Sequence, residues 1–388
     1  MKTILWTGSA CLFLCLAHEP LAAAVLAATN TTIKSVFATA KDGDTIVLSG
    51  IFGRTNLADR SFANSLTIDA SNASFNGQLT MRAVAGVKVR GGLFSMAPGD
   101  AQKGLAVRVD FSDRVSFLNV AFVGAGVATE RGLAFVKSTN VLVKSSRFTG
   151  LRQGIGLDSV TGALLTGNNF VASTSDGIDI ANSHDVTAIG NLCKGTIPSL
   201  GAHPDCIQLW SVAGQPMQSD IRLLDNKAYG FTQGFTSFDP DAASGIRISI
   251  IGNWVETSMP QGIACYGCFD SVITGNTLIT LPGAKYRTFL RVPGGTNNIV
   301  ADNNIGPLPP SATGGFLEPT AAFEDDALAM GFARSANFEA DALPTRLDDS
   351  FAAMGAAGDV PEPSIWLQFL VGFGCAGAFL RRRQAALA

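Results

Sequence analysis

The stretch Gly177-Ile178-Asp179-Ile180 decides the fold, because its pattern of one glycine followed by alternating apolar residues returns along the chain. Similar four-residue stretches begin at positions 132, 154, 206, 234 and 262, at intervals of 22 to 29 residues. Gly-Asn or Asp-Asn pairs lie between them, with their asparagines at positions 168, 191, 226, 253, 276 and 303. The two sets keep step over about six repeats, which indicates short strands separated by turns.

A repeat of this length cannot bury an apolar face alone, so it must stack on its neighbours. The sequence therefore predicts an all-β chain folded as a right-handed parallel β-helix, in which single coils stack from residue 25 to residue 306. The recurring asparagines are expected to form a ladder, each amide bonding the coils above and below. The spacing disfavours a propeller, since one blade needs about 40 residues. The segment 34–50 is expected to cap the N-terminal end.

The N-terminal end has the three parts of a secretory signal peptide. Lys2 is followed by an apolar stretch from Thr3 to Leu16, and Leu21-Ala22-Ala23-Ala24 offers small residues for cleavage. The apolar stretch is too short to span a bilayer. We therefore expect signal peptidase to remove residues 1–24 and the rest of the chain to be exported.

The C-terminal end also has three ordered parts. Pro361-Glu362-Pro363 precedes an apolar run from Ile365 to Leu380, and Arg381-Arg382-Arg383 follows it. Such a run is long enough for a transmembrane helix, with the arginines on the cytoplasmic side. Residues 360–388 thus resemble the PEP-CTERM sorting signal of Gram-negative bacteria. The resemblance implies transient anchoring in the inner membrane, processing by an exosortase, and a final place at the outer surface or in the extracellular matrix; the alternative is an ordinary single-span anchor.

Composition narrows the function classes further. Residues 307–359 are acidic and rich in Ala, Gly and Pro, which is typical of a linker. The 28 Lys and Arg against 31 Asp and Glu give a net charge of −3, and this balance does not favour a nucleic-acid partner. Cys193 and Cys206 can close the loop between them, and Cys265 and Cys268 are expected either to pair or to lie buried.

Stacking turns equal positions of successive repeats into columns on one face, because neighbouring strands lie about 4.8 Å apart. Three such columns are expected to point outward. They contain Gly156, Asp179, Gln208, Thr236 and Ala264; Asp158, Ala181, Trp210, Phe238 and Tyr266; and Gln153, Asp176, Asp205, Gln233 and Gln261. Aromatic rings beside amides and carboxylates favour a sugar-binding groove, although such rings also pack under long loops. The stacked aspartates are expected to raise one another's pKa, or to bind calcium.

The stretches Thr174–Ile180 and Asp205-Cys206-Ile207 resemble the N-T-D and D-D-C motifs of the polygalacturonase family of glycoside hydrolases. The resemblance implies a pectinase-like right-handed β-helix, with Asp176 and Asp205 holding the nucleophilic water. Pro204 replaces the aspartate that acts as general acid in that family. Gln233 stands in place of the family's histidine, and Gln261-Gly262-Ile263-Ala264 replaces the arginine and lysine that grip the sugar carboxylate.

The stretch from His203 to Trp210 is similar to a motif of exported β-helix proteins related to alginate epimerases and polysaccharide lyases. That resemblance implies removal of a proton next to a uronate carboxylate, which needs a base and a neutralising charge. His203 is the candidate base. In one reading Asp205 sets the tautomer of His203. In the other, Asp176 and Asp179 hold a calcium ion that neutralises the substrate carboxylate.

Arg287 and Arg291 are expected either to bind uronate at the end of the groove or to be solvated surface. The first hypothesis for function is a lyase or epimerase that acts on acidic exopolysaccharide. The alternatives are a non-catalytic protein that binds exopolysaccharide in the matrix, a degenerate polygalacturonase-like hydrolase, and a structural adhesin.

Overall fold

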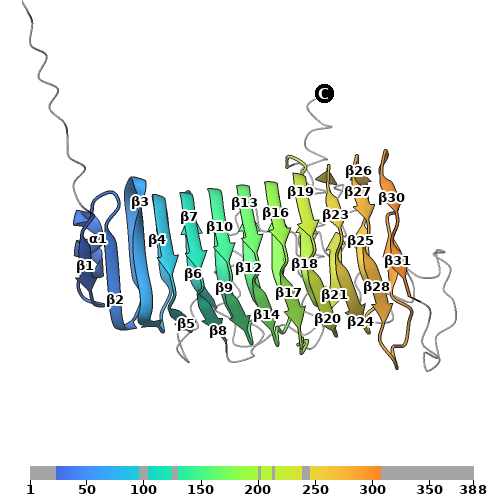
Figure 1. The fold of residues 1–388 in the computed structure, drawn as a ribbon, viewed down its shortest axis with the longest axis horizontal. Helices are drawn as coiled ribbons and strands as arrows, with labels where there is room; N and C mark the ends of the chain where they lie inside the picture. The colour runs from blue at the N-terminus through green and yellow to red at the C-terminus, as the bar shows by residue number, and fades with distance from the viewer. Residues whose placement is uncertain are drawn as a thin grey trace, which may run out of the picture.

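The computed structural model describes residues 23–95, 104–124, 130–199, 202–211, 215–237 and 245–306. These residues form a stack of coils in which successive strands pair in parallel, as Figure 1 shows from the blue N-terminal end to the orange C-terminal end. Three strands make up a typical coil, and a right-handed connection between parallel strands is the rule. The prediction of a right-handed parallel β-helix is confirmed.

Three parallel sheets run along the axis. The first, called the site sheet below, begins beside β4 and contains β6 Leu105–Asp110, β9 Arg131–Val136, β12 Gln153–Asp158, β15 Ile178–Ala181, β18 Asp205–Trp210, β21 Gln233–Ser237, β25 Gln261–Cys265 and β29 Phe289–Arg291. The second contains β7 Asp113–Leu118, β10 Thr139–Lys144, β13 Thr161–Thr166, β16 His184–Ile189, β19 Ser219–Leu224, β22 Gly245–Ile246, β23 Ser249–Ile251, β26 Cys268–Phe269, β27 Val272–Thr274 and β30 Ile299–Ala301. The third contains β5 Leu93–Ser95, β8 Ala121–Val123, β11 Arg147–Thr149, β14 Asn169–Val171, β17 Leu192–Lys194, β20 Lys227–Gly230, β24 Trp254–Thr257, β28 Thr277–Thr280 and β31 Asn304–Ile305.

The N-terminal coils are built from longer strands and one helix. They consist of β1 Val25–Ala28, α1 Ile33–Thr39, β2 Thr45–Phe52, β3 Thr55–Phe75 and β4 Leu79–Arg90. The helix packs against the first three strands and buries Ile33 and Phe37. It therefore lies at the end of the stack, within the segment that the sequence predicts as a cap (Figure 1).

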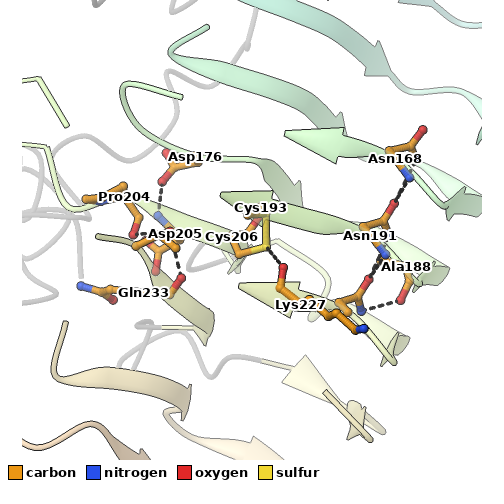
Figure 2. The surroundings of a disulfide bond; sticks show 12 residues. Asn168, Asp176, Ala188, Asn191, Cys193, Pro204, Asp205, Cys206, Lys227 and Gln233 are labelled. Carbon is orange, nitrogen blue, oxygen red and sulfur yellow. Dashed lines mark hydrogen bonds between the residues drawn. A yellow bond between two sulfur atoms is a disulfide. The ribbon is translucent and has the colours of Figure 1, made fainter. Parts of the chain in front are cut away.

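The asparagine ladder is present as expected. Six asparagines, one per coil, are joined by bonds of 2.8 to 3.1 Å from each side-chain amide to the next side-chain oxygen. Each of the first five also bonds the coils on both sides. The Asn191 side chain, for example, donates to Leu165 O on the preceding coil, and the Asn191 backbone N–H donates to Asn226 Oδ1 on the following one. Figure 2 shows Asn168 and Asn191 in this arrangement. The ladder satisfies buried polar atoms that would otherwise be costly.

A stack of phenylalanines fills the core of the first coils. Adjacent rings lie 4.5 to 5.2 Å apart, centroid to centroid. The stack consists of Phe52, Phe75, Phe94, Phe122, Phe148 and Phe170. On the next coil the equivalent position is Cys193, so the aromatic stack ends where the first disulfide begins.

In the described part of the chain, no helix has the length and apolar character needed to cross a membrane. The predicted linker, the PEP-CTERM signal with its transmembrane helix, and nearly all of the predicted signal peptide lie outside the described residues.

Candidate functional site

The site sheet brings His203, Asp205 and Asp176 together at the entrances of two neighbouring strands. Asp205 is the first residue of β18, and its side chain is fully buried. His203 Nδ1 lies 3.3 Å from Asp205 Oδ2, while Thr236 Oγ1 donates to Asp205 Oδ1 at 2.6 Å. The backbone N–H of Asp205 donates to Asp176 Oδ1 at 2.8 Å, a contact visible in Figure 2. The two aspartates predicted from the motifs are thus joined by a hydrogen bond from the backbone of one to the carboxylate of the other.

Asp179 lies three residues after Asp176, inside strand β15. In β15 it stands in register with Gly156 on one side and Gln208 on the other. Gln153 Nε2 donates to Asp179 Oδ2, whereas Asp179 Oδ1 is buried without a hydrogen-bond partner. A buried carboxylate oxygen without a partner is destabilising unless a ligand or water completes it.

Burial raises the pKa of all three aspartates, and repulsion from neighbouring carboxylates adds to the rise at Asp176 and Asp179. The pKa of Asp176 rises to about 6, chiefly through burial and then through the charge of Asp205, although His203 opposes the rise. Burial also raises the pKa of Asp205, against the hydrogen bond from His203. The pKa of Asp179 rises well above its usual range through burial and the nearby Asp176. A carboxyl group that remains protonated near neutral pH can act as an acid.

The raised pKa of Asp176 predicts a pH-dependent stability. Between its ordinary value of 3.8 and its folded value of about 6 the folded protein binds more protons than the unfolded chain, so the free energy of unfolding falls as pH rises through that range. In Asp176→Asn this loss disappears. Relative to wild type, the variant's free energy of unfolding should rise from pH 4 to pH 6 and then level off, as urea titrations at several pH values would show.

Asp220→Asn is the matched control for that series. Arg247 lies 2.6 Å from Asp220 and holds its pKa down to about 2. The stability from this ion pair is therefore complete above about pH 4 and is lost only in stronger acid. A stability difference that is constant between pH 4 and pH 7 for both variants would contradict the assignment to Asp176.

Two arginines near the aspartates did not emerge from the sequence. Arg131 is the buried first residue of β9 and stands in register with Gln153. Burial and the positive charge of Arg152 lower the pKa of Arg131 to about 9, while Asp179 and Asp176 oppose this fall. Both arginines in turn lower the pKa of Asp179. Extending the column Gln153–Gln261 by one coil toward the N-terminus would have found Arg131, which directly precedes Gly132.

The strand register matches the predicted columns. Gly156, Asp179, Gln208, Thr236 and Ala264 follow one another in register, and Asp205 pairs with Gln233. Their exposure differs from the expected open groove, since Gln208, Gln233 and Thr236 are at most 2% exposed. These side chains of the predicted outward columns are therefore covered by other parts of the fold. Trp210 and Tyr266 are half-buried, and Phe238 lies outside the described residues.

Arg291 and Tyr266 lie together on two neighbouring coils beyond the aspartates. Arg291 is in register with Ala264, which places it in the column of Asp179. Its guanidinium lies 5.6 Å from the centre of the Tyr266 ring, and its Nη1 lies 3.5 Å from the tyrosine oxygen. Arg287 instead donates to Ile305 O at 3.4 Å. Arg291 is the arginine that shares a column with the candidate site.

Both cysteine pairs form disulfides. Cys193 pairs with Cys206 and Cys265 with Cys268. The pairing of Cys193 with Cys206 confirms the expected loop closure, and for Cys265 and Cys268 it selects pairing over simple burial.

The three aspartates do not fit the expected calcium site. Across the described ranges no three His, Cys, Asp or Glu side chains are grouped to hold a metal ion. The physical reason is that donors already occupy most of the oxygens: Thr236 and the His203 ring contact Asp205, and Ser175 Oγ donates to Asp176 Oδ2 at 2.8 Å. Positive charge near Asp179 comes from the arginines instead.

Comparison with known proteins agrees with the fold. A family model described as periplasmic copper-binding protein (NosD) matches residues 37–208. An alginate lyase from Paenibacillus sp. str. FPU-7 has a TM-score of 0.55 and 16% identity, covering 72% of this chain and 99% of that one. The surface adhesin PfbA of Streptococcus pneumoniae has a TM-score of 0.46 and 12% identity over 68% and 85%. Pectate lyase C from Erwinia chrysanthemi has a TM-score of 0.39 and 15% identity, covering 79% of this chain and 90% of that one. No curated protein matches the sequence.

The description of the matching family raises copper as a ligand, and the described residues do not fit it. Copper prefers histidine, cysteine or methionine ligands. All four described cysteines are in disulfides, and among the described residues no three His, Cys, Asp or Glu side chains are grouped to hold a metal ion. The chemistry of this site therefore involves carboxylates, one imidazole and arginines.

Proposed function

We propose that the protein acts outside the cytoplasm on an acidic polysaccharide, as a lyase or epimerase that removes the proton next to a uronate carboxylate. The contact of His203 Nδ1 with the buried Asp205 carboxylate is the observation that carries this proposal. A carboxylate that accepts the Nδ1 proton makes Nε2 the unprotonated ring nitrogen, which is the state that a base needs. The His203 side chain is 24% exposed, so substrate can reach it.

The reaction would begin with transfer of the C5 proton of a uronate to His203 Nε2. In elimination, the electron pair of the broken C–H bond forms a C4=C5 double bond while the C4–O bond breaks. The departing oxygen then takes a proton, for which Asp176, with its raised pKa, is the candidate donor. In epimerisation, C5 instead takes a proton from water on its opposite face, and His203 releases the abstracted proton to solvent.

Arginine charge would stabilise the negative charge that develops on the substrate carboxylate. Arg152 and Arg131 act on the pKa of Asp179 and so lie within electrostatic reach of the site. Arginine binds carboxylates through two parallel bonds and remains charged where lysine would not. Arg291 and Tyr266, further along the column, would bind another residue of the same sugar chain.

A panel of uronate polymers tests the proposal. Purified protein is incubated with alginate, pectate and bacterial acidic exopolysaccharides. Absorbance is followed at about 235 nm, where the unsaturated product of elimination absorbs. Chain length and epimer ratio are measured on the same samples. Polymers that stay unchanged in all three properties would contradict enzymatic action.

The two replaced motif positions favour a second candidate, a matrix protein that binds exopolysaccharide without turnover. Pro204 and Gln233 occupy positions of catalytic groups in polygalacturonases, so a hydrolase site that has lost its chemistry is consistent with these residues. Co-sedimentation with the same polymers distinguishes the two. Binding without any change in the polymer, unaffected by His203→Ala, would favour the binding protein.

Gln233 offers a test of the unpaired polar atoms beside the candidate site. It is fully buried, and neither Oε1 nor Nε2 has a partner. Gln233→Met keeps the volume and removes two unpaired polar atoms, so we expect the free energy of unfolding to rise by about 1 kcal/mol. Urea unfolding measures this effect.

Gln78→Met is the control, because Gln78 is also buried, at 7% exposed, but donates to Leu105 O at 3.0 Å. That variant should lose about 1 kcal/mol. A loss of stability in Gln233→Met similar to that in Gln78→Met would contradict the expectation, because it would mean that Gln233 is hydrogen-bonded in the folded protein.

The same proposal places the protein outside the cytoplasm. Two buried disulfides are typical of proteins that fold in an oxidising compartment. Signal peptidase would act near residue 24 and an exosortase near the Pro361-Glu362-Pro363 motif. Mass spectrometry of the protein released from cells would test both cleavages, and a product that retains either end would contradict that one.

A further inference from the structure

The Cys193–Cys206 disulfide lies directly beneath the candidate site. Cys206 follows Asp205 in β18, Cys193 lies in β17, and both are buried. Gly177, which follows Asp176, packs on the bond: a Cβ added there would lie 2.9 Å from Cys193 Sγ and 2.6 Å from Cys206 O. In Figure 2 the disulfide lies with Asp176 and Asp205 on one side and the asparagine ladder on the other. The bond therefore supports the backbone of both carboxylates.

The same bond closes the loop that carries His203. The two cysteines are 13 residues apart, and the loop between them leads from the third sheet to the site sheet. On its way the loop backbone donates from Ile197 to Ser173 O at 2.9 Å and from Ser199 to Thr174 O at 3.0 Å. After His203, Pro204 O accepts from the Gln233 N–H at 2.7 Å. The loop is thus tied to the coils on both sides, and covalently at its ends.

The contacts around Asp176 and Asp205 depend on the same backbone. Gly177 N–H donates to Asp205 O at 2.9 Å, in addition to the bond from Asp205 N–H to Asp176 Oδ1. A rotation of the peptide unit between Asp205 and Cys206 would disturb the bond to Asp205 O directly, and it would reach the Asp205 N–H through the Asp205 Cα. The angle at which Asp205 meets the imidazole would change with them.

We propose that the Cys193–Cys206 disulfide is a positioning element that keeps His203 in the tautomer required for proton abstraction. The inference rests on the proposed function for its effect on rate, but its effect on the imidazole stands independently. Cross-linking the two ends restricts the conformations open to the loop, and the packing of Gly177 on the sulfur transmits that restriction to Asp176. Neither cysteine touches substrate.

The second disulfide provides a matched control. Cys265 and Cys268 are as deeply buried as the first pair, but they lie in β25 and β26, two coils along from Asp205 in the site sheet. Cys193→Ala/Cys206→Ala and Cys265→Ala/Cys268→Ala each remove one buried bond. Only the first pair borders the His203 loop.

The readout is the ¹⁵N NMR spectrum of the histidine rings, whose shifts distinguish Nδ1–H from Nε2–H. His184, which contacts Ser219, is the internal reference. Wild type and the Cys265→Ala/Cys268→Ala variant should show one Nδ1–H form of His203, whereas Cys193→Ala/Cys206→Ala should show a mixture. On a turned-over substrate, kcat should fall on the order of tenfold to hundredfold with KM little changed.

Each outcome decides one of the two proposals. If the first variant keeps the wild-type His203 spectrum, the positioning role is overturned, whatever the activity. If wild type shows the single tautomer but no substrate is turned over, the positioning role stands and the proposed function fails. Should the variant not fold, dithiothreitol titration of the Cys265→Ala/Cys268→Ala protein reduces the remaining bond alone. An unchanged His203 spectrum after that reduction likewise overturns the inference.

Discussion

Replacing Asp205 by asparagine is expected to lower kcat for proton abstraction on the order of 10³-fold, the range that a general base and its orienting carboxylate contribute. Asparagine keeps the size of the side chain and can still accept from Thr236 Oγ1 at Oδ1. It offers His203 an N–H in place of a carboxylate oxygen, which favours the wrong tautomer and no longer stabilises the protonated ring. Steady-state kinetics on the best uronate polymer measure the loss.

Two comparisons make that result specific. Asp220→Asn removes an aspartate from the second sheet, where it pairs with Arg247, and should leave kcat unchanged. His203→Ala should lose as much as Asp205→Asn, and the double variant little more, since the two groups act as a unit. Independent, multiplying losses would contradict the assignment of His203 and Asp205 as one pair.

Asn226→Ala is expected to lower the free energy of unfolding by about 3 to 4 kcal/mol, because it breaks the ladder in the middle of the stack. Asn226 Oδ1 accepts from both the backbone and the side chain of Asn191, and its Nδ2 donates to Ala188 O and to Asn253 Oδ1. Alanine leaves buried donors of Asn191 and the Ala188 carbonyl without partners. Chemical denaturation would measure the change in midpoint and slope.

Asn297→Ala is its control. Asn297 is exposed and donates to Asp270 Oδ1 at 3.0 Å, so its loss should cost less than about 1 kcal/mol. A similar small cost for Asn226→Ala would mean that the ladder adds nothing to the stability of the stacked coils.

The repeat made the fold predictable from the sequence because each coil has to meet the same two demands. A small residue is needed where Gly154 approaches the Phe170 ring and Gly177 O, and an asparagine is needed where the backbone turns. These demands recur once per coil, so they appear as a period. The column positions of Asp176, Asp179 and Asp205 follow from that period alone.

The rest of the site depends on contacts that have no period. Arg131 directly precedes the repeat that begins at Gly132, but its effect on Asp179 comes from burial and distance, which a linear pattern does not contain. The covering of Gln208 and Thr236 depends on how side chains of neighbouring coils pack. Whether Cys265 and Cys268 pair depended on geometry at one turn, which the sequence left open.

Proton abstraction at C5 by His203 is open to a test by ¹H NMR in D₂O. Purified protein is incubated with uronate polymers in D₂O, and the C5–H resonances are followed over time. We expect either loss of those resonances through deuterium uptake, as in epimerisation, or new olefinic signals, as in elimination, and we expect neither with His203→Ala. Polymers that keep every C5 proton, and gain no olefinic signal, while still binding the protein would contradict proton abstraction at C5.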